Sequence, residues 1–296
     1  MNFAKTNKDF IFSFEVYPPK KTSPIEVVYE AVAELSKLKP DYISVTYGAG
    51  GGAATAAATV EICSLIKNTY HTETVAHLPG INLTREQVAS LLLRLRAHNI
   101  TKVLALRGDY NSEDDRDIEA QANTLQEGDF KYASELVAYI KELDVDDDFN
   151  ISAACYPEVH CEADSMQSDM QNLKTKVDAG TSLLISQLFF DNAVFYDFLE
   201  RCDSVGIKVP IQAGIMPLKN PRQSKHIMKL CNPSIPKDLQ KLINKYQDCD
   251  KSFRQAGIEY ASMQILDLIE KKVNGIHLYT MNSPSTAKAI TDAICS

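Results

Sequence analysis

The sequence predicts an α/β fold of one kind, a single (β/α)8 TIM barrel, in which parallel strands form a closed cylinder inside a ring of helices. Eight short β-prone runs alternate with segments of helical period along the 296 residues. That length suits one such barrel, which typically needs about 250 residues. No linker or shift of composition divides the chain, so we expect one domain over residues 1–296. An open doubly wound sheet more usually ends at about six strands.

The expected strands are rich in β-branched and aromatic residues, and the expected helices repeat apolar residues every three or four positions. The strands are 11–18, 42–47, 74–77, 102–106, 150–156, 183–190, 208–214 and 275–280. The clearest helices are 26–37, 86–95, 169–177, 193–202 and 260–271. Thr84 and Gln87 form a capping-box pattern at the start of the second of these helices.

The composition limits which classes of partner and location we expect. A net charge of −8 disfavours nucleic acid as the main partner, because no basic field is present to neutralise phosphates. The N-terminus has no apolar leader pattern, and no uninterrupted apolar run is long enough to cross a membrane. The 7 cysteines are scattered without CxxC spacing, which is typical of reduced thiols. We therefore expect a cytoplasmic protein with small-molecule substrates.

Glu15 is the most informative residue. It interrupts the apolar, β-prone run Phe12–Tyr17, which Pro18 and Pro19 then end. A carboxyl group near the end of a core strand is expected where that end opens onto a site. Partial burial there would favour the protonated carboxyl, as a general acid requires. The alternative is a solvated acid at a strand end.

Polar residues gather at the other expected strand ends as well. Active sites of such barrels lie at the C-terminal ends of the strands, so a ring of polar side chains there predicts a site. These residues are Glu15, Thr46, Tyr47, His77, Arg107, Gly108, Asp109, Tyr156, Glu158, His160, Gln187, Asp191, Tyr279, Thr280 and Asn282.

Four local patterns each allow a functional and a structural interpretation. The segment 48–53 matches GxGxxA, and Glu73 follows at roughly the spacing of a dinucleotide-binding fold; a flexible βα loop near a cofactor is the interpretation we favour. His160 lies near Glu158 and Cys161, yet no further ligand has metal-site spacing, so no metal is expected.

Arg107 could pair with a phosphate while Gly108 lets the backbone approach a planar ligand; a structural pair between Arg107 and Asp109 is the alternative. Asp169, Asn172 and Lys176 share one helix face. That face either is solvated or points at the diphosphate and ribitol of a cofactor.

Together the chain's segments resemble the methylenetetrahydrofolate reductase family, bacterial-type flavoprotein barrels that make 5-methyltetrahydrofolate. The matching segments are Ser13-Phe14-Glu15 with Pro18-Pro19, Ser44-Val45-Thr46-Tyr47-Gly48-Ala49, Ala105-Leu106-Arg107-Gly108-Asp109, Tyr156-Pro157-Glu158-Val159-His160, Lys176-Val177-Asp178-Ala179-Gly180 and Gln187-Leu188-Phe189-Phe190-Asp191.

The resemblance implies a (β/α)8 barrel that reduces 5,10-methylenetetrahydrofolate with NADH or NADPH by ping-pong hydride transfer through FAD. It implies that Glu15 is the catalytic acid, that Asp109 tunes the flavin and contacts the folate, and that Gln187 and Gln223 bind the substrate. The implied FAD contacts are Thr46, Tyr47, Ala49, His77, Arg107, Gly108, Asp109, Tyr132, Tyr156, His160, Ala163, Asp169, Asn172 and Lys176.

Some positions depart from the family pattern. Thr175 and Ser283 stand where relatives can carry arginines, residues 53–58 lose charges, and Pro79-Gly80 replaces a more usual Thr-Cys. Two alternatives therefore stay open: a Rossmann-type NAD dehydrogenase, and a non-catalytic barrel subunit that binds folate or a partner. The choice between NADH and NADPH, the oligomeric state and the need for a partner subunit also stay open.

An acidic insertion follows the fourth expected strand. Residues 111–129 carry seven acidic side chains and are expected to form either a solvated loop or a lid or docking surface at the active face. The chain ends soon after the eighth strand's helix, so we expect no C-terminal regulatory domain.

Overall fold

The computed structural model describes residues 10–19, 23–47, 53–81, 83–108, 128–160, 162–231 and 233–295. Ala49, Asp109, the glycine-rich segment 48–52 and residues 111–127 of the acidic insertion lie outside this part of the chain.

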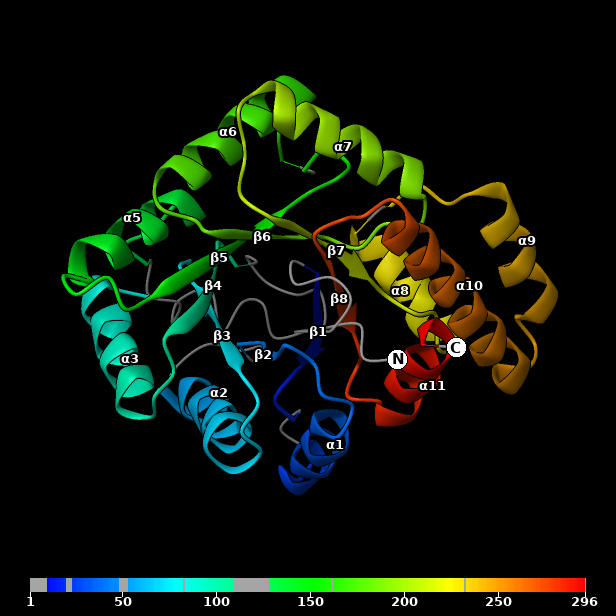
Figure 1. Cartoon of the computed structure of the whole chain (residues 1–296), viewed down its shortest axis with the longest axis horizontal. Coiled ribbons are helices and arrows are strands. Elements are labelled where there is room, and N and C mark those ends of the chain that lie inside the picture. The colour runs from blue at the N-terminus through cyan, green and yellow to red at the C-terminus, as the bar shows by residue number, and fades with distance from the viewer. Residues whose placement is uncertain are drawn as a thin grey trace, which may run out of the picture.

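Parallel strands close into a barrel, which confirms the predicted fold class (Figure 1). In the described chain the order around the barrel is the order in the sequence, and β1 closes the ring by pairing with both β2 and β8. The strands are β1 (Ile11–Val16), β2 (Tyr42–Val45), β3 (Thr74–Pro79), β4 (Lys102–Leu106), β5 (Asn150–Cys155), β6 (Leu183–Ser186), β7 (Ile211–Ile215) and β8 (Gly275–Tyr279).

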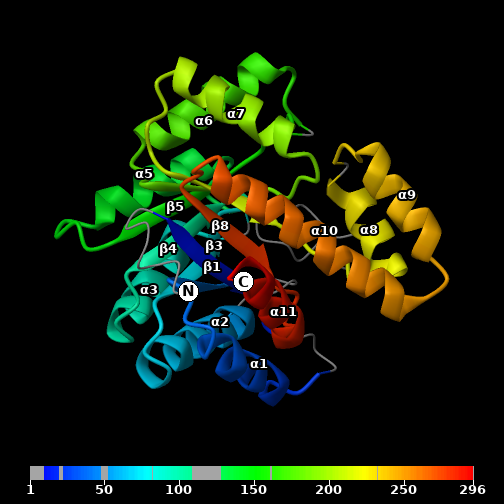
Figure 2. The same ribbon diagram turned by 45° about the vertical axis from the view of Figure 1, so that its right-hand side comes forward.

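Helices surround the barrel on its outer side (Figure 2). They are α1 (Glu26–Ser36), α2 (Ala53–Ser64) with the π-helical turn η2 (Leu65–Thr69), α3 (Arg85–Ala97), α5 (Ala133–Leu143), α6 (Met166–Asp178), α7 (Asn192–Ser204), α8 (Pro221–Cys231), α9 (Lys237–Tyr246), α10 (Asp250–Glu270) and α11 (Pro284–Ile294).

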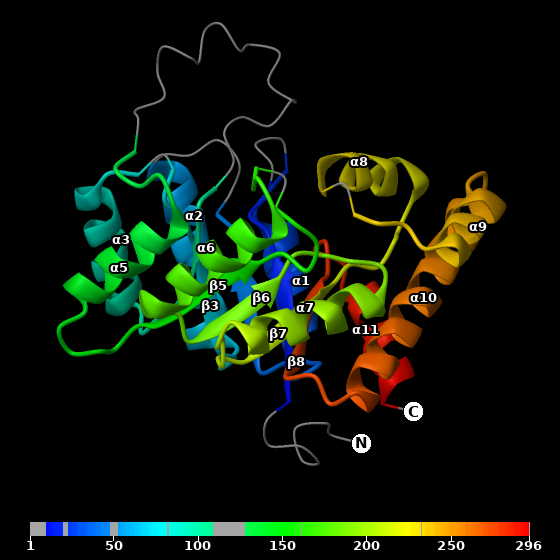
Figure 3. The ribbon, with the colours of Figure 1, turned by 90° about the horizontal axis from the view of Figure 1, so that it is seen from above.

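The connection between β7 and β8 is longer than the expected single helix. In the described chain it contains α8, α9 and α10, and Figure 3 shows α8 and α9 beside α10 on one side of the barrel. A separate apolar cluster stabilises this connection. In it Leu218, Leu239, Ile243 and Phe253 pack together. The apolar residues of α8 and α9 pack into this cluster and not into the main core. Each helix has few of them, so its sequence is similar to that of a surface segment and the helix was not predicted.

Two expected strands differ from the structure by three or more residues at one end. The strand expected at 208–214 begins only at Ile211, because Pro210 has no N–H to donate to a ladder. The strand expected at 183–190 stops at Ser186. Leu188 and Phe190 leave the sheet and pack into the cluster beneath α8 and α10.

The inside of the barrel has an apolar layer and a polar layer. Tyr42, Val75, Leu104 and Ile185 form an apolar cluster of their own, apart from the core between strands and helices. Toward the C-terminal ends of the strands the buried side chains become polar. They are Ser44, His77, Ser186 and His277, and Ser13 and Gln212, the second residue of β7, continue this polar set deeper into the barrel. The polar layer points to the end of the barrel that holds a site.

The capping box predicted at Thr84 is present. The Thr84 hydroxyl accepts a hydrogen bond from the Gln87 backbone N–H at 3.3 Å, and the Gln87 side chain accepts one from the Thr84 N–H at 2.8 Å. These contacts begin α3, which buries Val88, Leu91, Leu92 and Leu95 against the sheet. None of the described helices is long and apolar enough to cross a membrane.

We predict that Thr84→Ala lowers the free energy of unfolding by about 1 kcal/mol, because the cap no longer satisfies an orphan N–H of α3. Thr84→Ser keeps the hydroxyl and should unfold like the native protein. Urea unfolding followed by circular dichroism measures the difference, and equal midpoints for Thr84→Ala and native protein would contradict the assignment.

Candidate active site

Glu15 lies where the polar layer meets the open end of the barrel. It is the fifth residue of β1 and pairs in register with Ser44 of β2 and Tyr279 of β8. Its side chain is 19% exposed, and its Oε2 atom lies 3.6 Å from Nε2 of both His77 and His277. The carboxyl group that the sequence singled out is therefore partly buried and flanked by two imidazoles.

His277 lies beneath Glu15 and is fully buried. Its Nδ1 is 2.7 Å from the Ser13 hydroxyl, and its Nε2 is 3.3 Å from the Ser44 hydroxyl. Because Ser13, Glu15 and His277 lie on neighbouring strands β1 and β8, the sheet register brings them together. His277 and Ser13 were not among the predicted site residues.

A second layer of hydrogen bonds supports Ser13. Gln212 of β7 donates from Nε2 to the Ser13 hydroxyl at 3.1 Å and accepts from the Tyr42 hydroxyl through Oε1. Burial raises the pKa of Tyr42 well above its ordinary value, so this phenol stays protonated as the donor. The Tyr42 ring also stacks on His277, with centroids 5.9 Å apart.

His77 is neutral at physiological pH. Its side chain, on β3, is buried at 5% exposure, and this burial lowers its pKa from 6.5 to about 4 despite the opposing charge of Glu15. Within the described residues its Nε2 has no hydrogen-bond partner, because 3.6 Å to Glu15 is too long. A buried nitrogen in this state is ready for a ligand.

The predicted cofactor residues after β5 form one connected group. The His160 backbone N–H donates to Asp169 at 3.0 Å, and the His160 ring meets Tyr156 edge-on at 4.5 Å. The Ala163 N–H donates to the carbonyl of His160 at 2.9 Å. Lys176 donates to the Ala154 carbonyl at 2.7 Å, and burial lowers the pKa of its ammonium group. Asp169 and Lys176 are only partly exposed on α6, whereas Asn172 is exposed.

Arg107 and Gly108 follow β4 at the same end of the barrel. The guanidinium of Arg107 forms a two-pronged pair with Glu162, with Nη2 2.8 Å from Oε1, and this hydrogen bonding lowers the pKa of Glu162. Gly108 has a φ of +89°, and a Cβ there would lie 2.9 Å from Cγ2 of Ile81. Only glycine suits this turn. Glu162 was not among the predicted site residues, because its partner lies 55 positions away in the sequence.

The remaining predicted residues lie around the same rim with varied exposure. The Thr46 N–H donates to the Val16 carbonyl at 2.9 Å, which joins the ends of β1 and β2. Burial raises the pKa of the neighbouring Tyr47. Tyr132 starts α5 and is 51% exposed, so its ring lies on the surface in this structure.

The two predicted substrate glutamines lie after neighbouring strands. Gln187 follows β6; its N–H donates to the Cys155 carbonyl at 2.7 Å, and its side-chain oxygen accepts from Leu188 at 2.9 Å. Gln223 is in the first turn of α8, where its N–H bonds the Asn220 side chain at 2.8 Å. Both are partly exposed. Gln187 lies in the segment after β6, and Gln223 lies in the segment after β7.

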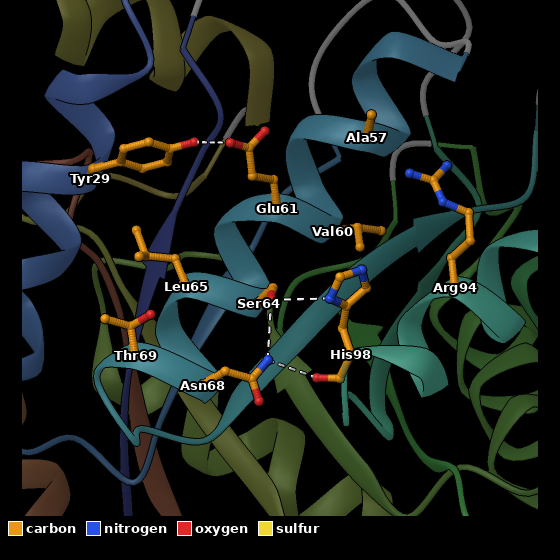
Figure 4. A pocket seen from close by; sticks show the side chains of 10 residues that line it. All are labelled: Tyr29, Ala57, Val60, Glu61, Ser64, Leu65, Asn68, Thr69, Arg94 and His98. Carbon is orange, nitrogen blue, oxygen red and sulfur yellow. Dashed lines mark hydrogen bonds between the residues drawn. The ribbon is translucent and has the colours of Figure 1, made fainter.

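A hollow of about 530 Å³ lies elsewhere, between α1, α2 with η2, and α3 (Figure 4). In it the Ser64 hydroxyl lies 3.2 Å from the His98 ring, and Asn68 donates to Ser64 and to the His98 carbonyl. None of the predicted site residues lines it. Its polar groups join neighbouring helices, so we assign it a structural role.

Comparison with known proteins shows the family to which this chain belongs. The family model described as methylenetetrahydrofolate reductase matches residues 1–295. The chain belongs to the methylenetetrahydrofolate reductase family. A family member from Escherichia coli, named 5,10-methylenetetrahydrofolate reductase, is 35% identical over 292 residues, which cover 98% of this chain and 92% of the relative.

A plant member of the family, methylenetetrahydrofolate reductase (NADH) 1 from Arabidopsis thaliana, is 35% identical over 288 residues. Those residues are 94% of this chain but 47% of the relative, so the chain spans about half the length of the plant proteins it matches. A solved Clostridium thermocellum protein, described as binding two copies of 5-methyl-5,6,7,8-tetrahydrofolic acid, shares the fold with a TM-score of 0.63 at 14% identity.

We predict that the buried, neutral His77 makes stability depend on pH. Its pKa is 6.5 in the unfolded chain and about 4 in the folded one, so between these values the unfolded state binds more protons. The contribution of His77 is fully present above pH 6.5 and is lost as pH falls toward 4. It amounts to about 3 kcal/mol across that window.

Urea unfolding of the ligand-free protein at several pH values measures this effect. His77→Gln should flatten the pH dependence relative to the native chain, and His98→Gln, at an exposed site, should not. Parallel curves for His77→Gln and the native protein would contradict the assignment.

Proposed function

We propose that this chain is an FAD-dependent reductase that converts 5,10-methylenetetrahydrofolate to 5-methyltetrahydrofolate, with NADH or NADPH as the hydride donor. The observation that carries the proposal is the Glu15 carboxyl, held between two buried imidazoles at the C-terminal end of the barrel. Family membership and the name of the E. coli relative support the reaction. The names of the plant relatives favour NADH as the donor.

The rim residues suit FAD. His77 offers a buried nitrogen without a partner, and Gly108 has a turn that leaves no room for a side chain. Lys176, Asp169 and His160 supply charged and polar groups after the strand β5, which pairs with β4. The residues proposed to hold FAD are Thr46, Tyr47, Ala49, His77, Arg107, Gly108, Asp109, Tyr132, Tyr156, His160, Ala163, Asp169, Asn172 and Lys176. When bound, the flavin supplies hydride transfer from the nicotinamide to the folate methylene.

Glu15 is proposed to act on the folate alone. The methylene group of the substrate bridges two nitrogens, and opening that bridge requires a proton on the departing nitrogen. Oε2 of Glu15 is turned toward the histidines, which leaves Oε1 for the substrate. His77 is neutral, so it places no full positive charge beside the Glu15 carboxyl.

Other residues are proposed to position the substrate and to tune the cofactor. Gln187 and Gln223 extend from the ends of β6 and from α8 and carry amide groups that match the donors and acceptors of a pterin. Asp109 would disfavour negative charge on the reduced flavin, which makes hydride donation easier. Each role acts on binding or electrostatics, whereas the transferred proton belongs to Glu15.

The closed barrel argues against the alternative of a Rossmann-type NAD dehydrogenase. That fold needs an open sheet in which the strand order reverses. The non-catalytic alternative rested on missing arginines. The structure retains an intact acid between two histidines, which favours turnover.

We predict that the purified protein is yellow, with the absorbance spectrum of FAD, and that NADH bleaches it. His77→Ala should weaken FAD binding about 10-fold, since one hydrogen bond is worth roughly 1.4 kcal/mol. Titration of the ligand-free protein with FAD, followed by fluorescence, measures the affinity. A purified protein that is colourless and also fails to bind added FAD would contradict the proposal.

We further predict that Glu15→Gln separates the two half-reactions. Glutamine has nearly the shape of glutamate but cannot donate the proton, so folate reduction should fall by about 10²–10⁴-fold. Nicotinamide consumption needs no such proton and should continue at a nearly native rate. Rapid-mixing absorbance measurements follow each half separately, with Glu30→Gln on the exposed face of α1 as the control. Equal slowing of both halves would make Glu15 a structural residue.

A further inference from the structure

The loop after β5 carries a carboxylate that binds a segment of a distant connection. Glu158 lies three positions after the end of β5, and Ser234 lies between α8 and α9. The Ser234 backbone N–H lies 2.9 and 3.0 Å from the two carboxyl oxygens of Glu158, and the Ser234 hydroxyl donates to Oε2 at 2.6 Å. We call this set of contacts the Glu158–Ser234 clasp. A single carboxylate thus accepts both donors of Ser234.

The two segments of the clasp are stiff before they meet. Pro157 precedes Glu158, and Pro233 precedes Ser234. Because a proline fixes its own φ, each segment has less conformational freedom to lose when the contact forms. The Arg201 guanidinium, on α7, donates to the Pro157 carbonyl at 2.9 Å and holds the loop after β5 in place. This rigidity favours the clasp, although Ser234 is exposed and water competes for its donors.

The helix next to the clasp is lightly packed. Of the α8 side chains that the structure describes, only Ser224 is buried. Ile227 and Met228 are partly buried where they pack against the apolar cluster of this connection. At the start of the helix, Asn220 accepts a hydrogen bond from the Gln223 N–H at 2.8 Å. A helix with so little buried surface is easily displaced, so a polar contact just beyond its C-terminal end has a large influence on its position.

The clasp also joins the two sides of the predicted substrate region. In the barrel, β6 lies between β5 and β7, and the clasp connects the loop after β5 to the connection after β7. Gln187 follows β6, and its N–H donates to the Cys155 carbonyl, at the end of β5, at 2.7 Å. Gln223 lies in the first turn of α8. Both glutamines are therefore fixed relative to the same loop, Gln187 directly and Gln223 through α8 and the clasp.

We propose that Glu158 is a positioning residue for the substrate. By binding Ser234 it fixes the C-terminal end of α8, and because an α-helix of 11 residues moves as a rigid rod, it sets where Gln223 lies relative to Gln187. Glu158 lies within the loop that carries proposed cofactor residues, so the clasp ties the substrate helix to the cofactor side of the rim. The role at the substrate rests on the function proposed above, whereas the clasp itself does not.

Amide hydrogen exchange of the purified chain, measured by mass spectrometry, tests the clasp. In Glu158→Ala the peptides of α8 should exchange about 10-fold faster than in the native protein, because hydrogen bonds to a charged acceptor no longer hold the end of the helix. The peptides of α7 should keep their native rates. The control is Glu200→Gln, which changes an exposed carboxylate on α7 and should leave α8 unaffected. Unchanged exchange of α8 in Glu158→Ala would overturn the proposal.

Steady-state kinetics of the FAD-loaded protein test the role at the substrate. Glu158→Ala should raise KM for 5,10-methylenetetrahydrofolate about 10-fold and change kcat by less than about 2-fold, because the clasp positions a binding residue and transfers neither proton nor hydride. Ser234→Ala should show part of this effect, and Ser234→Thr, which retains the hydroxyl, should recover most of the loss. A native KM in Glu158→Ala, despite faster exchange of α8, would overturn the positioning role. A native protein without folate turnover would reject the proposed function together with that role, and the exchange measurement would still decide the clasp.

Discussion

Polar side chains sealed inside the barrel must satisfy one another, since buried hydrogen-bonding groups are costly when left unpaired. Tyr42, Gln212, Ser13 and His277 do so in one continuous series of contacts that ends at Glu15. Because each member depends on the next for its orientation, the position of the Glu15 carboxyl is set by residues on three other strands as well as its own.

The division of the barrel interior explains how one fold serves both stability and chemistry. Toward one end, Val75, Leu104 and Ile185 pack together in an apolar cluster. Toward the other, the polar series opens onto the rim where the proposed cofactor residues lie. The imidazole of His77 is buried enough to stay neutral and still directs an unpaired nitrogen toward the site.

Sequence reasoning reached the strands, the capping box and Glu15 because these depend on local patterns. Ser13 was within reach as well, since it lies two residues before Glu15 and so faces the same side of β1. His277 and Gln212 were harder, because a single polar residue within an apolar strand does not reveal which side chains it will meet across the barrel. The pairing of Arg107 with Glu162 joins residues after two different strands, and no spacing rule predicts it.

A crystal structure with 5-methyltetrahydrofolate bound would test the central claim most directly. If Glu15 delivers the proton, the departing amine nitrogen of the folate should lie within about 3 Å of Oε1 of Glu15, with Oε2 still facing His77 and His277. The pterin should then lie over the C-terminal end of the barrel. A folate bound away from this rim, or a Glu15 side chain turned away from the ligand, would contradict the account.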